Sequence, residues 1–182
     1  MTNLPPAAFT LFVVLGLSGC GYNSLQQQDE AVKTSWSQVV SLYQRRADLI
    51  SSLAATVKGV AATEKELIGV AESSARSGSM PAAAAVLNDP AAFATYLAVQ
   101  ERLTASLQRL MSLGAVYPQL QSDDNFLDLR AQLVETEDHI TSARNRYIEA
   151  ARLFNSTVRS FPTDLTARIF DYQPQPILSG DK

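Results

Sequence analysis

The chain has one cysteine, Cys20, and the residues before it give its thiol a specific chemistry. An apolar run from Ala7 to Leu17 is followed by the small residues Ser18 and Gly19. A short apolar stretch that ends in small residues is typical of a secretory signal peptide, and a cysteine directly after it indicates a bacterial lipoprotein. We expect residues 1–19 to be removed as a signal peptide and the Cys20 thiol to carry a diacylglyceryl group. This covalent lipid is the only cofactor that we predict.

An uncleaved N-terminal membrane helix is the alternative interpretation of the same segment. A membrane-spanning helix needs about 20 apolar residues, whereas the run here is shorter and is preceded by Pro5 and Pro6. The segment from Met1 to Phe9 contains neither Lys nor Arg, which signal peptides normally carry. Either the signal is weak or the true start codon lies upstream.

The expected location is the bacterial cell envelope. In this interpretation residues 20–23 are a lipid-anchored N-terminus on the periplasmic side of the membrane. Gly21 follows the cysteine, at the position where lipoproteins kept at the inner membrane carry aspartate. In a double-membraned bacterium, the outer membrane is therefore favoured.

His139 is the only histidine and the first candidate for a metal ligand. Glu135 lies four residues before it on the same helical face, but both flank the apolar stripe rather than lying on it. A di-metal bundle needs carboxylates from several helices and two Glu-x-x-His pairs. One histidine and no spare cysteine leave no catalytic triad, and no glycine-rich phosphate loop is present. We therefore predict neither a metal site nor a catalytic residue.

Polar residues that interrupt the apolar stripes are better candidates. Glu137 stands where an apolar residue is expected, Arg144 follows one heptad later, and Arg46 borders the stripe of the first helix. A buried carboxylate is costly unless it is paired, so we predict a buried polar network in which Glu137 meets Arg46 or Arg144. Such a network can fix helix register; the alternative is a polar notch that binds a partner.

The C-terminal tail, residues 171–182, has no helical period and contains two prolines. We expect it to be extended. Phe170, Tyr172 and Ile177 lie at the start of this tail and within it, and no apolar stripe accounts for them. We predict that these three side chains bind a partner; the alternatives are that they pack the ends of the bundle or meet the membrane surface.

The elements that position these residues follow from apolar periodicity. Apolar residues recur three and four positions apart, the period of an amphipathic helix, in three long segments: residues 23–77, 90–116 and 122–160. Asn23 is suited to cap the first, and Asp89 with Pro90 is suited to begin the second. A short helix is expected over residues 163–170. The prediction is an all-α, elongated antiparallel helical bundle over residues 24–170.

Composition restricts the partners of this bundle. The net charge is −3, and acidic and basic residues are interspersed along the chain. Because no basic block or stripe appears, nucleic acid is not an expected partner. No second cysteine is present, so no disulfide supports the fold.

Residues in both halves of the chain resemble the LemA family. The first half matches in Gly21-Tyr22-Asn23, Asp29-Glu30, Val32, Trp36, the string from Tyr43 to Ile50, the string from Thr56 to Gly59, and Glu64-Lys65. The second half matches in Tyr117 to Leu120, Asn125-Phe126, Leu129, Glu137, Ile140, Ala143-Arg144, Tyr147, Asn155 and Phe161-Pro162. The resemblance covers nearly the whole mature chain. One departure is Ser51-Ser52, where the family usually has Pro-Asn.

The resemblance implies a mostly four-helix antiparallel bundle that is tethered to a bacterial membrane and faces away from the cytoplasm. It supplies no established catalytic or ligand-binding residue. It implies envelope or integral membrane proteins as partners, among them proteins with a TPM domain; a homo-oligomer is an open alternative. We interpret the chain as an envelope accessory or scaffold protein that acts by protein–protein binding and is not an enzyme. The alternatives are an envelope enzyme and a ligand-carrying helical bundle.

Overall fold

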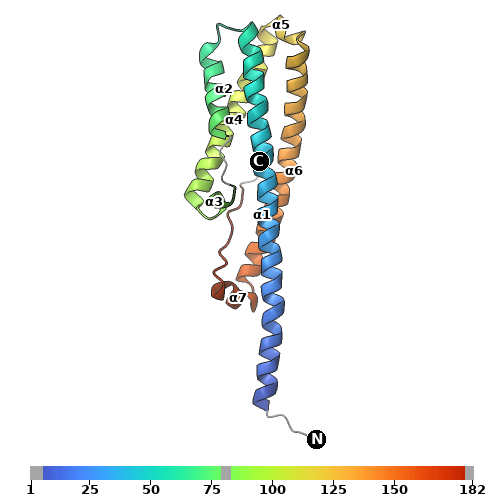
Figure 1. Ribbon diagram of the computed structural model, residues 1–182, viewed down its shortest axis with the longest axis vertical. Coiled ribbons are helices and arrows are strands. Elements are labelled where there is room, and N and C mark those ends of the chain that lie inside the picture. The colour runs from blue at the N-terminus through green and yellow to red at the C-terminus, as the bar shows by residue number, and fades with distance from the viewer. Residues whose placement is uncertain (1–5, 79–82, 179–182) are drawn as a thin grey trace. The chain divides into compact units, whose positions relative to one another are not determined.

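The computed structural model describes residues 6–78 and 83–178, with side chains at 21–78 and 85–178. Every regular element within these residues is an α-helix (Figure 1). The helices are α1 (Pro6–Val60), α2 (Lys65–Gly78), α3 (Ala83–Leu87), α4 (Pro90–Val116), α5 (Pro118–Gln121), α6 (Asp124–Arg159) and α7 (Thr163–Ile169). The predicted all-α helical bundle is confirmed.

The chain forms two compact units. One contains residues 36–145 and is called the bundle unit below. The other combines residues 1–35 with residues 146–182 and is called the terminal unit. Both α1 and α6 contribute residues to each unit.

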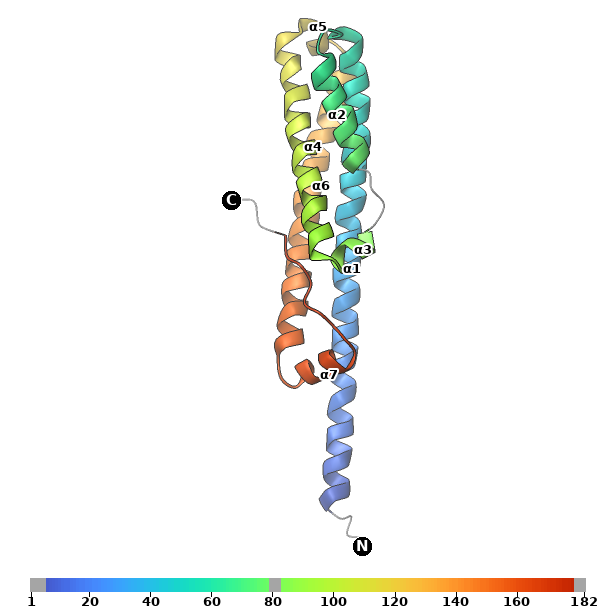
Figure 2. The same cartoon turned by 90° about the vertical axis from the view of Figure 1, so that its left-hand side faces the viewer.

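In the bundle unit, four helical segments lie side by side and alternate in direction (Figures 1 and 2). They are residues 36–60 of α1, α2, α4, and residues 124–145 of α6. The turn between α1 and α2 lies at the same end as α5, and Tyr117 joins the two connections. Its hydroxyl group donates to Glu64 Oε1 at 3.1 Å and lies 3.2 Å from Thr63 Oγ1.

The core of the bundle unit consists of the apolar stripes that periodicity identifies. Its fully buried side chains include Ile50, Leu53, Val57, Leu103, Leu110, Phe126 and Leu133. Beside these, the ring of Trp36 lies 5.2 Å from that of Phe93 and 5.9 Å from that of Tyr96. Together with Ile68 and Ala71 of α2, these buried side chains supply the main stabilisation of the unit.

The prediction of one continuous helix over residues 23–77 is wrong. The chain leaves α1 after Val60, reverses over residues 61–64, and returns as α2. The spacing of the apolar residues does not reveal this break, because Val57 before it and Ile68 after it are both buried in the same core. α1 also begins at Pro6, so Asn23 lies inside the helix and does not cap it. At Ser51-Ser52, α1 continues without interruption.

The other predicted helix boundaries agree with the structure. The Asp89 carboxylate accepts from the backbone N–H groups of Ala91 and Ala92, at 2.9 and 3.2 Å, and thereby caps α4. Asp123 caps α6 in the same way, since its Oδ1 accepts from the N–H of Phe126 at 2.8 Å. The Asp89 cap is a local interaction, which explains why the sequence predicts it; the Asp123 cap was not predicted.

The terminal unit contains α7, the last part of α6, and the residues of α1 that precede Trp36. Leu25, Phe154 and Ala167 are buried, one from each helix. After α7 the chain continues as the extended tail, as predicted, up to Leu178. Residues 179–182 of the predicted tail lie outside the described residues.

Candidate functional site

Arg46 is the centre of a polar network inside the bundle unit. Its side chain projects from α1 and is only 4% exposed. One terminal nitrogen donates to Glu137 Oε1 at 3.1 Å and to Thr104 Oγ1 at 2.9 Å, and the other donates to Gln100 Oε1 at 2.8 Å. The guanidinium group also lies 5.0 Å from the centre of the Tyr43 ring, close enough for a cation–π interaction.

Gln100 extends this network to the end of α2. Its Nε2 group donates to the backbone carbonyl of Gly78 at 3.3 Å, while its Oε1 accepts from Arg46. One of the last carbonyl groups of α2, which has no partner within its own helix, is thereby satisfied. The network thus joins all four helices of the bundle unit through α1, α2, α4 and α6.

The structure brings two of the three predicted network residues together. Glu137 meets Arg46, whereas Arg144 hydrogen-bonds the side chain of Tyr43 instead. The Glu137 side chain is 36% exposed, and Thr136, at 1%, takes the inward position on that turn. The sequence analysis did not identify Thr104. The only signal for this residue is its position one turn after Gln100, the polar residue that interrupts the apolar stripe of α4.

The tyrosines beside this network are held in their neutral form. Burial raises the pKa of Tyr96 to about 12, and the nearby Arg46 opposes this shift only in part. Burial also raises the pKa of Tyr43, against the opposing effect of the Arg144 and Arg46 charges. A phenol with a raised pKa is a poor nucleophile and base at neutral pH. The arrangement is therefore suited to connecting helices.

In the terminal unit the tail is hydrogen-bonded to α6. Asn155 Nδ2 donates to the carbonyl of Gln175 at 2.8 Å, and the N–H of Gln175 donates back to Asn155 Oδ1 at 2.7 Å. The hydroxyl group of Tyr147 donates to the carbonyl of Pro176 at 2.5 Å. Because later tail residues bond earlier α6 residues, the tail runs antiparallel to α6. Its conformation is fixed by these bonds and by the burial of Leu178, which is 1% exposed.

The three predicted tail residues have different environments. Phe170 is 54% exposed, and its ring lies 4.6 Å from that of Tyr22. Tyr172 is half-buried, with its ring 6.0 Å from that of Phe154. Ile177 is 42% exposed. The structure therefore does not gather these side chains into one patch.

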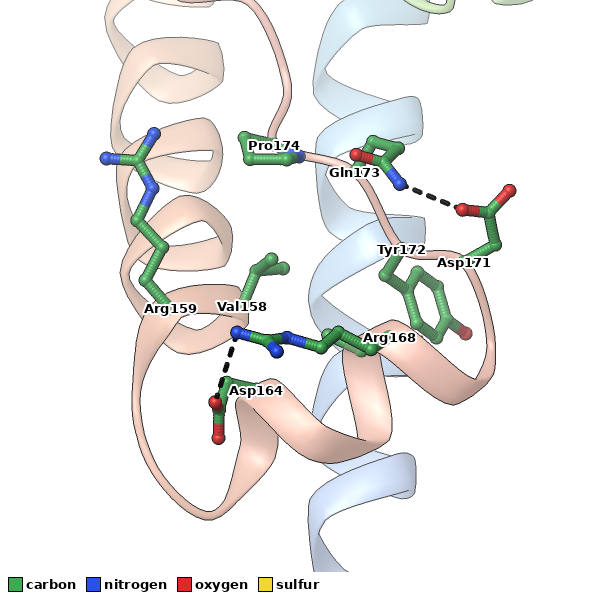
Figure 3. A pocket seen from close by; sticks show the side chains of 9 residues that line it. Val158, Arg159, Asp164, Arg168, Asp171, Tyr172, Gln173 and Pro174 are labelled. Carbon is green, nitrogen blue, oxygen red and sulfur yellow. Dashed lines mark hydrogen bonds and ion pairs between the residues drawn. The ribbon is translucent and has the colours of Figure 1, made fainter.

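Two grooves flank the tail. The first, of about 410 Å³, lies between α6, α7 and the tail (Figure 3) and is lined by Val158, Arg159, Asp164, Ala167, Arg168, Asp171, Tyr172, Gln173 and Pro174. Its carboxylates have partners, because Asp164 lies 4.0 Å from Arg168 and Asp171 accepts from Gln173 at 2.8 Å. The second groove, of about 450 Å³, is lined by Arg152, Asn155, Ser156, Arg159, Ser160 and Ile177.

Arg159 lines both grooves, and Arg152 lies two turns before it in the second. Within the described part of the chain, neither side chain has an ion-pair partner. The described residues that line the second groove carry two guanidinium groups and no carboxylate. This groove, which we call the tail groove, therefore combines uncompensated positive charge with the exposed apolar side chain of Ile177.

The remaining candidates of the sequence can be placed as follows. His139 and Glu135 are exposed on α6, and no group of three or more metal-binding side chains occurs among the described residues. The backbone of residues 6–20 belongs to α1. The side chain of Cys20 lies outside the described part of the structure, as do those of the predicted signal peptide, residues 1–19. Among the described helices, none is long and apolar enough to cross a membrane.

Comparisons with known proteins agree with the fold. A family model described as the LemA family matches residues 35–182. Magnetosome protein MamQ of Magnetospirillum gryphiswaldense is 32% identical over 68 residues, which are 37% of this chain and 25% of that protein. Magnetosome proteins MamQ 1 and MamQ 2 of Paramagnetospirillum magneticum are each 34% identical over the same shares. The chain thus matches about a quarter of the length of these relatives.

Proposed function

Because this chain belongs to the LemA family, we propose that it is a membrane-tethered accessory or scaffold protein of the bacterial cell envelope that acts by binding other proteins. Family membership supports association with a membrane. The tether in this proposal is a lipid on Cys20, with the protein on the periplasmic side and, in a double-membraned bacterium, at the outer membrane. Catalysis is not part of the proposed role.

The tail groove is the observation that carries the binding role. Its walls are fixed, since Asn155 and Gln175 exchange two hydrogen bonds and hold the tail against α6. A preformed groove loses little conformational entropy when a partner binds. Arg152 and Arg159 supply charge, and Ile177 supplies an apolar contact at its edge.

This chemistry indicates the kind of partner segment that fits. Guanidinium groups bind carboxylates in a bidentate manner, and two of them two helical turns apart can engage two acidic side chains. We therefore propose that the partner is an envelope or integral membrane protein with an acidic segment that also carries an apolar side chain. Proteins with a TPM domain are candidates for the source of this segment, and nucleic acid is not.

In-cell photo-crosslinking on intact membranes tests this function. A photoreactive amino acid at Ile177 is expected to capture one or a few envelope proteins. The matched control is the same amino acid at Val134, which is 54% exposed on α6 but lies away from the tail groove in sequence. Capture at Ile177 should fall about tenfold in Arg159→Glu, which reverses one groove charge, and should persist in Arg130→Glu, an exposed arginine elsewhere on α6.

Three outcomes contradict parts of the proposal. Equal capture at Ile177 and Val134 removes the tail groove from the interaction. Capture of copies of this chain alone replaces a heterologous partner with self-assembly. A purified protein that turns over a substrate, and loses this activity on mutation of its own residues, contradicts a binding role.

Mass spectrometry of the mature N-terminus tests the tether. We expect a chain that begins at a diacylated Cys20, and we expect Cys20→Ala to accumulate as the longer precursor. A mature protein that retains residues 1–19 with a free thiol contradicts the lipid anchor and supports the uncleaved helix.

A further inference from the structure

α7 and the residues next to it carry four large apolar side chains that are each more than half exposed. Phe161 lies in the turn before α7, whereas Leu165 and Ile169 lie four residues apart within α7, so the latter two project from one side of the helix. The exposed fractions of these three residues are 82%, 51% and 76%, and Phe170 adds a fourth apolar side chain at 54%. We call these four residues the α7 face. A contiguous exposed apolar patch marks an interaction surface.

This face lies beside the part of α1 that follows Cys20. A Cβ atom built on Gly21 lies 3.6 Å from Thr166 Oγ1 and 3.8 Å from Thr163 Cγ2, so α7 packs against α1 at that residue. The rings of Tyr22 and Phe170 lie 4.6 Å apart. From here α1 continues back through the apolar residues 7–17. The two α1 residues that contact α7 and Phe170, Gly21 and Tyr22, are thus the first and second residues after the predicted anchor, Cys20.

We propose that the α7 face lies on the surface of the lipid bilayer and buries its apolar side chains at the level of the headgroups. The inference rests on the proposed membrane tether but not on its form. A lipid on Cys20 and an uncleaved apolar helix both place residues 20–22 at the membrane surface. Tyrosine, as at Tyr22, is enriched at this interface, and Phe and Leu side chains form the buried face of helices that lie there.

The orientation of α7 fits this position. α7 lies crosswise to α1, which extends past it toward Pro6 (Figures 2 and 3). If α1 leaves the membrane steeply, α7 runs along the membrane plane, as interfacial amphipathic helices do. Its packing against Gly21 and the contact between Phe170 and Tyr22 hold it next to α1.

The charges near α7 indicate which force holds it there. Within α7 and the two residues after it, one arginine, Arg168, stands beside two aspartates, Asp164 and Asp171, and Arg168 pairs with Asp164 at 4.0 Å. Interfacial binding therefore depends on apolar burial rather than on attraction to anionic lipid. We expect equal contact with neutral and with anionic bilayers.

Depth-dependent fluorescence quenching tests the proposal on the whole protein, purified from membranes and reconstituted in phosphatidylcholine vesicles. Phe161→Trp and Ile169→Trp place a reporter on the α7 face. Leu153→Trp is the matched control, because Leu153 is 58% exposed on α6 of the same unit. The native Trp36 is kept, since at 1% exposure it gives a constant background that lipid does not reach.

Brominated phosphatidylcholine is expected to quench the two α7 reporters at least about twofold more than the Leu153 reporter, with equal quenching when anionic lipid is added. Protein that floats with the vesicles but shows no such difference overturns this inference and leaves the tether standing. Protein that does not float overturns both. A third outcome is shielding of the reporters that increases with the density of protein in the vesicles and does not depend on brominated lipid. This result assigns the α7 face to contact with a second copy of the chain and also overturns the inference.

Discussion

The ion pair between Arg46 and Glu137 is asymmetric, because the guanidinium side chain is 4% exposed and the carboxylate side chain is 36% exposed. The Arg46 charge is removed from water and depends on protein groups for its hydrogen bonds. Glu137, by contrast, remains partly hydrated. Loss of Glu137 therefore weakens the helix connections mainly by leaving a buried cation with fewer acceptors.

We expect Glu137→Ala to lower the free energy of unfolding by about 1.5–3 kcal/mol, the range for hydrogen bonds to charged groups. The remaining bonds of Arg46 to Gln100 and Thr104 limit the loss. Urea unfolding followed by circular dichroism measures it. The matched control is Glu135→Ala, which removes an exposed glutamate two residues away and should change stability by less than about 0.5 kcal/mol. Equal effects of the two substitutions would contradict a stabilising role for the pair.

Two glycines of α2 should respond to alanine in opposite directions. A Cβ atom on Gly78 would lie 3.0 Å from Leu103 Cδ2, and Leu103 is fully buried. We expect Gly78→Ala to destabilise the protein by about 1–3 kcal/mol through overpacking. At Gly69 a new Cβ meets nothing within 4 Å, so Gly69→Ala should stabilise the helix by up to about 1 kcal/mol. Thermal unfolding of both variants checks the prediction, and shifts of the same sign would refute it.

Stability should fall at alkaline pH because of buried tyrosines. Tyr96 has a pKa of about 12 in the folded protein, against about 10 in an unfolded chain. Between these values the unfolded state loses the phenolic proton and the folded state retains it, so rising pH favours unfolding. Tyr147, whose pKa is also raised by burial, acts in the same direction.

Urea midpoints measured from pH 9 to pH 12 test this dependence. The urea midpoint of Tyr96→Phe should decline less steeply above pH 10 than that of the wild type. The reason is that the variant lacks one of the phenolic protons that the folded state retains and the unfolded state loses. Parallel declines in the two proteins would show that Tyr96 does not contribute.

Asn155 should control the order of the tail. Asn155→Ala removes both hydrogen bonds to Gln175. Each is worth about 1 kcal/mol, so we expect the backbone N–H groups of Gln175, Ile177 and Leu178 to exchange with deuterium about tenfold faster or more. Helicity should not change, because the tail contributes no helix. Asn145→Ala, an exposed asparagine on the same helix, is the control; if it accelerates exchange in the tail equally, the effect is not due to these bonds.

The sequence alone determined the features that depend on neighbouring residues. The apolar stripes are correct because side-chain burial follows the helical period wherever a helix packs on a core. The start of α4 at Pro90 is correct because the Asp89 side chain bonds backbone groups two and three residues away. The extended tail follows from the absence of a period, and the LemA resemblance follows from strings of residues in order.

The tertiary structure alone decided the features that depend on contacts between distant residues. The reversal at residues 61–64 leaves no mark in the apolar period, since Val57 and Ile68 face one core on either side of it. A polar residue within an apolar stripe identified Glu137 from the sequence. The sequence could not decide whether the partner of Glu137 is Arg46 or Arg144, because the two arginines lie on different helices and the choice depends on how those helices pack. The α7 face likewise became visible only when packing showed which apolar side chains are left uncovered. A local pattern specifies what a side chain can bury, whereas its actual partner depends on how the helices are arranged in space.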